Sequence, residues 1–108
     1  MKLITKEILG KLEKNPRDHS GNKPWLKLFS PVGAATWLIS EIEADGDTLF
    51  GLCDLGMGHP ELGYVSLHEL ESITLPMGLG IERDMSFKPT KTLAEYAVDA
   101  RTAGHIEI

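Results

Sequence analysis

Two carboxylates and an imidazole occur close together in a glycine-rich stretch of this sequence. Asp54 and Glu61 flank His59, and Asp84 follows later in the chain. Carboxylates and imidazoles bind divalent metals and exchange protons, so these four residues are one candidate ligand, metal or catalytic site. Their spacing matches no defined metal motif, and polar residues are also common in turns, where they satisfy backbone groups. We take a turn as the main interpretation and expect no metal or cofactor.

A second candidate site is acidic. Asp45-Gly46-Asp47 is typical of a tight reversal between two strands, because aspartate and glycine tolerate the backbone angles that such turns need. Four carboxylates gather around this predicted hairpin tip, at Glu41, Glu43, Asp45 and Asp47. They are candidates for contact with a basic partner, although charges on exposed strands also simply deter aggregation.

Trp37 is the candidate anchor residue for such a partner. Alternation along residues 36–43 places Trp37 on one face with Glu41 and Glu43. A ring on that face would be partly exposed, as an aromatic anchor at an interface is. The competing interpretation is that Trp37 is a core residue, and core packing is the somewhat favoured of the two.

Other motifs that could support catalysis are incomplete. Cys53 is the single cysteine, and strand alternation groups it with apolar neighbours, so we expect a small buried side chain rather than a nucleophile. The glycine pairs at 56 and 58 and at 78 and 80 lack the third glycine of a dinucleotide site and the lysine of a P-loop. We interpret both as turns.

Apolar periodicity and capping signals predict the elements that position these residues. Thr5 caps a first helix that Asn15-Pro16 ends, and Thr92 opens a last helix that stops at Gly104. Strands are predicted at 25–29, 36–43 and 48–55, with loops at 17–24 and 56–63 and an edge strand at 81–87. Residues 64–65 could extend the sheet, and 67–71 could be a short helix or a strand.

The predicted fold class is α+β. We expect a single domain over residues 1–108, with an antiparallel meander of about four to five strands. The N-terminal and C-terminal helices are expected to pack on this sheet.

Charge and composition exclude several classes of protein. The net charge is −5, and lysines in the first 23 residues alternate with acidic residues, so we expect no direct binding of nucleic acid. No apolar stretch is long enough for a signal peptide or a membrane span. One cysteine forms no internal disulfide, and together these features predict a cytoplasmic protein.

Long motifs also resemble a known family. They read KLFSPVGAATWL at 27–38, DGDTLFGLCDLG at 45–56, PELG at 60–63, SLHEL at 66–70 and GLGIERD at 78–84. The sequence closely resembles a bacterial family catalogued as domain of unknown function 2958. The resemblance implies a short protein of conjugative plasmids or integrated elements, and it implies no catalytic residues.

Our leading hypothesis is a non-enzymatic protein-binding module of a mobile element, with a regulatory or anti-defence role. The predicted partner is a protein, and the oligomeric state stays open. The alternative is a small enzyme or a metal- or ligand-binding protein that uses Asp54, His59 and Glu61.

Overall fold

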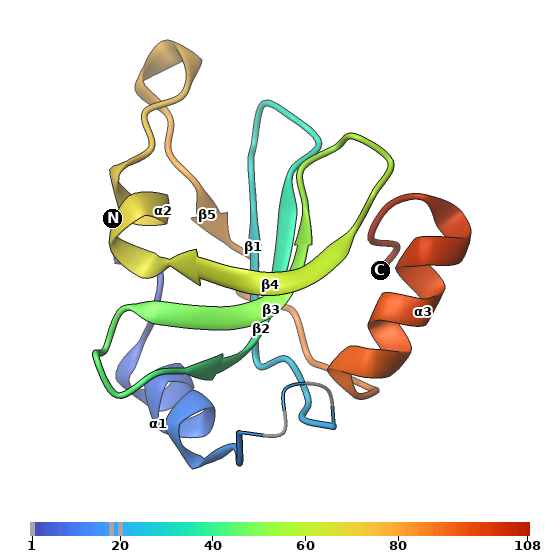
Figure 1. Cartoon of the computed structure of the whole chain (residues 1–108). Helices are drawn as coiled ribbons and strands as arrows, with labels where there is room; N and C mark the ends of the chain where they lie inside the picture. Colours follow the sequence, from blue (N-terminus) through green and yellow to red (C-terminus); the bar gives the residue numbers. More distant parts are fainter. Residues whose placement is uncertain (1, 18, 20) are drawn as a thin grey trace.

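Five strands form one antiparallel sheet in the order β4-β3-β2-β1-β5 (Figure 1). The computed structural model describes residues 2–17, 19 and 21–108. The strands are β1 (Leu26–Phe29), β2 (Thr36–Ile42), β3 (Thr48–Asp54), β4 (Glu61–Ser66) and β5 (Glu82–Arg83). The first four form the predicted meander, and β5 adds to the free side of β1. The predicted α+β class is confirmed.

The helices begin at the residues that the sequence signals indicate. They are α1 (Lys6–Lys14), α2 (Leu67–Ser72), the 3₁₀ turn η1 (Pro76–Gly78) and α3 (Leu93–Ala103). Thr5 accepts a hydrogen bond from the N–H of Ile8, and Ser66 accepts one from the N–H of Glu69. Thr92 and Glu95 complete a capping box, and Gly104 ends α3 in the left-handed region. None of the helices in the described ranges is long and apolar enough to span a membrane.

The sheet separates two apolar cores, and helices cover both of its faces (Figure 1). The first core holds Trp37 and Ile39, with residues from α1 and α2 packed against them. The second core holds Leu38 and Leu52 under α3. The predicted packing of the terminal helices is therefore confirmed, with α1 and α3 on opposite faces.

A β-bulge in β2 overturns the predicted alternation. The register with β3 shifts between Ile39 and Glu41, so that Ser40 is the additional residue. Glu41 pairs with Phe50 and lies on the face of Leu38, not on the face of Trp37. The side-chain amide of Asn15, just after α1, donates to the carbonyl oxygen of Ser40 at 2.7 Å and holds the bulge in place.

The bounds of two predicted segments need correction, and the structure answers one open question. The predicted loop 56–63 ends earlier, because Glu61, Leu62 and Gly63 already pair with β3. The open question at 67–71 is answered by α2, which follows β4 directly. The predicted edge strand 81–87 shortens to the two residues of β5.

Candidate functional site

Asp54 is a structural residue of the sheet rather than a loop residue. It ends β3, and its side chain is only 2% exposed. One carboxylate oxygen accepts from the N–H of Gly56 at 2.8 Å, and the other accepts from the N–H of Ile106 at 2.9 Å. Asp54 thus ties the C-terminal segment to the end of β3 through one oxygen, and its other oxygen holds the turn that follows β3.

The other members of the predicted loop site do not join Asp54. His59 and Glu61 are exposed, whereas Asp84 follows β5 on the far side of the sheet, three strand spacings or about 14 Å from β3. Asp84 pairs with Lys27 at 3.3 Å and accepts from the N–H of Ser86. Within residues 2–17, 19 and 21–108, no three His, Cys, Asp or Glu side chains are placed to hold a metal ion.

Every carboxylate of the acidic hairpin has an internal partner. Glu41 is 4% exposed and accepts from the backbone N–H of His19 at 2.8 Å, so it holds the loop after α1. Glu43 pairs with Arg17 at 2.8 Å. Asp47 accepts from the N–H of His68 at 2.7 Å and from the hydroxyl of Ser66 at 2.7 Å. The hairpin acids therefore fasten the tip to its neighbours.

Asp45 gives the hairpin a pH dependence. The hydroxyl and N–H of Thr48, together with the N–H of Asp47, lower the pKa of Asp45 from 3.8 to about 2. A lowered pKa in the folded state stabilises the fold above pH 3.8, and this contribution is lost as the pH falls toward 2. We expect Asp45→Asn to weaken the pH dependence of the unfolding free energy in that window. Urea titrations of both proteins at several pH values measure it, and parallel curves would contradict this assignment.

Cys53 lies half-buried in β3, in register with Trp37. Burial raises the pKa of its thiol from 9.0 to about 11, so the reactive thiolate is scarce near neutral pH. We expect iodoacetamide to alkylate the native protein much more slowly than the urea-unfolded protein. Because the chain has a single cysteine, the mass increase reports Cys53 alone. Equal rates in both states would identify an activated thiol instead.

Trp37 is a core residue, as the favoured interpretation predicted, and the alternative of a partly exposed anchor is wrong. Its side chain is 5% exposed and packs in the first core. It also lies at the other end of β2 from the acidic tip, six residues or about 20 Å from Glu43. Trp37 and the tip therefore do not form one surface.

An apolar groove lies above Trp37 and is lined by residues of β4 and α2. It has a volume of about 500 Å³. We call it the β4 groove, and its lining residues are Trp37, Leu55, Tyr64, Val65, Ser66, Glu69, Leu70 and Ile73. Trp37 and Leu70 are buried at its floor, whereas Leu55 is 60% exposed and Ile73 is 37% exposed. Large apolar side chains thus border a hollow that solvent reaches.

The groove runs beside an open edge of the sheet. In the part of the chain that the structure describes, β4 is the terminal strand and pairs with β3 alone. Gly63 lies on the groove side of β4, because alternation places it on the face of Val65 and because its partner Gly51 pairs with Ile39 of the first core. A Cβ atom added at Gly63 would meet nothing within 4 Å. The edge strand therefore has open space beside Gly63 on the groove side.

Sequence analysis missed most of this groove. Leu55 and Ile73 are ordinary apolar residues in the sequence, 18 positions apart, and only the fold brings them together. Gly51 and Gly63 pair across β3 and β4, but this pairing is visible only in the folded structure.

The comparisons with known proteins give one match. No curated protein and no solved structure matches the chain. A family model described as "Protein of unknown function (DUF2958)" matches residues 3–107. This match covers nearly the whole chain, as the resemblance of its motifs indicated. The chain therefore belongs to the DUF2958 family.

Proposed function

We propose that this protein is a non-enzymatic binding module that takes an extended segment of a partner protein along the free edge of β4. The observation that carries the proposal is the β4 groove, an apolar hollow with exposed Leu55 and Ile73 directly beside an unpaired strand edge. A segment that pairs with the strand gains backbone hydrogen bonds, and its alternate side chains enter the groove.

The edge of β4 lacks the usual protection against such pairing. Native edge strands carry lysine, proline or a bulge, or another element covers them. Residues 61–66 contain no lysine or proline, and the register with β3 is continuous over all six residues. At the other edge of the sheet, β5 has only two residues. β4 is therefore the edge of the sheet that is suited to accept a strand.

The charge around the groove indicates the chemistry of the partner segment. Glu69 lines the groove, and Glu61 begins the edge strand with its side chain exposed. The chain as a whole carries a net charge of −5. Complementary potentials favour association, so we expect a segment with two or more apolar side chains flanked by Lys or Arg.

The biological role that we propose follows from this interaction and from the resemblance described above. On a mobile element, a small module that captures one extended segment would act on a host protein, as a regulatory or anti-defence factor. The partner is then a protein, and the module needs no cofactor for its action.

A peptide-display selection tests the site directly. The baits are the wild-type protein, Gly63→Leu and, as the matched control, Gly10→Leu. A Cβ atom added at either glycine meets nothing within 4 Å, but Gly10 lies in α1 and does not line the groove. We expect wild type and the Gly10 variant to enrich the same peptides, with apolar and basic residues alternating, and the Gly63 variant to enrich none of them.

Two outcomes would overturn the proposal. One is enrichment of the same peptides by all three baits, which would place binding elsewhere on the surface. The other is a stable dimer of the purified protein that Gly63→Leu dissociates, as measured by light scattering. That result would make a second copy of this chain the occupant of the β4 edge.

A further inference from the structure

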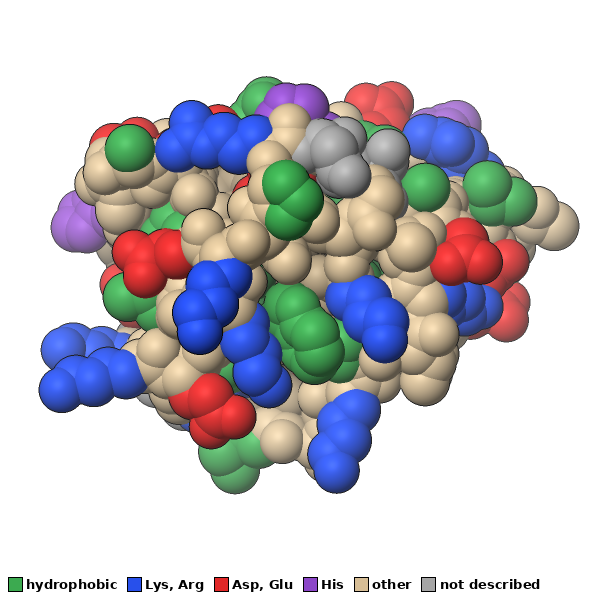
Figure 2. Space-filling view, turned by 90° about the horizontal axis from the view of Figure 1, so that it is seen from below, with side chains coloured by type: hydrophobic (Ala, Val, Ile, Leu, Met, Phe, Trp, Pro, Cys, Tyr) green, Lys and Arg blue, Asp and Glu red, His purple; other side chains and the backbone are tan. Residues whose placement is uncertain are grey.

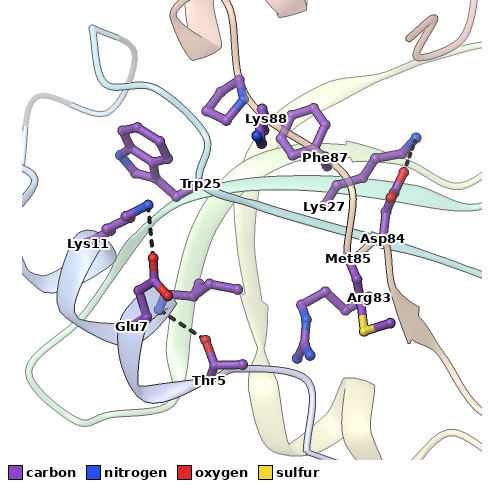
Figure 3. Close-up of a pocket in the computed structure, with 12 residues that line it drawn as sticks. Thr5, Glu7, Lys11, Trp25, Lys27, Arg83, Asp84, Met85, Phe87 and Lys88 are labelled. Carbon is purple, nitrogen blue, oxygen red and sulfur yellow. Dashed lines mark hydrogen bonds and ion pairs between the residues drawn. The ribbon is translucent and has the colours of Figure 1, made fainter.

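A second cavity lies toward the other edge of the sheet, between α1, β1 and β5 (Figure 3). Its volume is about 310 Å³, which is at the lower end of the range for small-molecule sites. None of its lining residues belongs to the β4 groove. The cleft is therefore independent of the β4 groove and of the proposed function.

Positive charge concentrates in this cleft although the chain is acidic overall. Four cationic side chains line it, Lys11, Lys27, Arg83 and Lys88. Only two acidic residues, Glu7 and Asp84, accompany them. Figure 2 shows Lys and Arg side chains gathered around an apolar hollow on the side of the molecule where α1 lies. Such a local reversal of the overall charge favours an anionic ligand.

Lys88 and Arg83 keep donors available for that ligand, whereas Lys11 pairs with Glu7 at 3.6 Å. Lys88 is exposed, and in the described part of the chain it has no ion-pair partner. Arg83 donates through one Nη to the carbonyl oxygen of Leu3 at 2.8 Å, and this bond fixes the guanidinium. A guanidinium has five N–H donors, so the others do not take part in that bond and can face a ligand. Lys27 pairs with Asp84 at 3.3 Å at the same side of the cleft.

Aromatic surface adjoins these cations. Trp25 and Phe87 are half-buried and line the cleft from two different segments (Figure 3). The ammonium group of Lys11 lies 4.4 Å from the centroid of the Trp25 ring. Partly exposed aromatic rings beside lysines and an arginine are the groups that bind a planar base and a phosphate, through stacking and charge-assisted hydrogen bonds.

We propose that this cleft binds a nucleoside phosphate. The base lies against the aromatic surface of Trp25 and Phe87, and the phosphate lies among Lys27, Arg83 and Lys88. The same chemistry can come from a free nucleotide or from the end of a single strand of nucleic acid. The absence of a long basic stripe in the sequence favours the free nucleotide.

Calorimetric titration tests the proposal with four kinds of probe: nucleoside diphosphates (ADP, GDP and UDP), adenosine, inorganic phosphate and a short single-stranded DNA. We expect at least one diphosphate to bind saturably, and at least about tenfold more tightly than either adenosine or phosphate, because both halves of the ligand contribute. Tighter binding of the DNA, with the same response to the variants below, would support the cleft and assign the phosphate to a strand.

The variants separate the cleft from general charge. Lys88→Glu is expected to weaken diphosphate binding by at least about tenfold, because it places a like charge beside the phosphate. Trp25→Leu is expected to weaken it through lost stacking. The control is Lys14→Glu, which makes the same change in net charge on an exposed lysine that lines no described cavity. Thermal unfolding checks that each variant is folded, and Lys88→Gln serves as a milder substitution.

Three results would overturn the proposal. The first is no saturable binding of any diphosphate or of the DNA by the wild-type protein. The second is an equal loss of binding in the Lys88 and Lys14 variants, which would show only general electrostatic attraction. The third is phosphate binding as tight as that of the diphosphates, which would show an anion site without recognition of the base.

Discussion

Gly51→Ala is expected to destabilise the protein severely, by at least about 3 kcal/mol. Gly51 lies in the middle of β3, opposite Ile39. A Cβ atom there would be 2.0 Å from the carbonyl oxygen of Leu38 and 2.9 Å from the Cα atom of Ile39. Both atoms belong to the backbone of the neighbouring strand, so they cannot move without disrupting the ladder. A domain of this size has a total stability of about 5–15 kcal/mol, so the variant is expected to be marginal.

Gly63→Ala is the matched control for this prediction. Gly63 is the direct partner of Gly51 on the next strand, yet a Cβ atom at this position meets nothing within 4 Å. We expect the stability of the Gly63→Ala variant to be unchanged or raised by up to about 1 kcal/mol, because alanine restricts the unfolded chain. Urea denaturation of the three proteins measures the difference. Equal stabilities of the two variants would contradict the close approach of β2 and β3.

Trp37→Ala is also expected to destabilise the protein strongly. Trp37 is 5% exposed and contacts the first core, so its truncation removes a large buried surface and leaves a cavity. Changes of this type cost about 3–5 kcal/mol. The same substitution at half-buried Trp25 is expected to cost clearly less. Urea denaturation of both variants makes the comparison. A loss of stability in the Trp37 variant no greater than that in the Trp25 variant would contradict the buried position of Trp37.

Local signals in the sequence predicted the elements well. Thr5, Thr92 and Gly104 act at helix ends as expected, because a cap depends on residues within one turn of the helix. The reversal at Asp45-Gly46 also depends on few residues, and Gly46 has the positive φ angle of 71° that such a turn uses. These signals are short in range, so one sequence is enough to interpret them.

The faces of β2 could not be predicted, because a bulge is not a local signal. Strict alternation from Trp37 places Glu41 beside it, but the extra residue at Ser40 reverses every later position. The bulge is held by Asn15, which is 25 residues distant in sequence. The prediction that Trp37 shares a face with Glu41 and Glu43 was wrong because of this one shift.

The candidate site was difficult to predict for a related reason. Carboxylates can bind metals and basic partners, so acidic residues were the predicted site residues. In the structure, however, Asp54 and Asp47 accept hydrogen bonds from backbone N–H groups outside their own strand or turn. Their partners are known only once the chain is folded. The β4 groove consists of apolar residues that carry no distinctive motif. Its signal is the space between elements, which a sequence does not display.

Affinity capture from the lysate of a bacterial host, after nuclease treatment, tests whether the free edge of β4 binds a partner protein. The three baits are the wild-type protein, Gly63→Leu and Gly10→Leu, and mass spectrometry identifies what each retains. We expect one stoichiometric protein that wild type and the Gly10 variant retain and that the folded Gly63 variant loses. Retention of that protein by the Gly63 variant, or the absence of any stoichiometric protein on the wild-type bait, would contradict binding at the β4 edge.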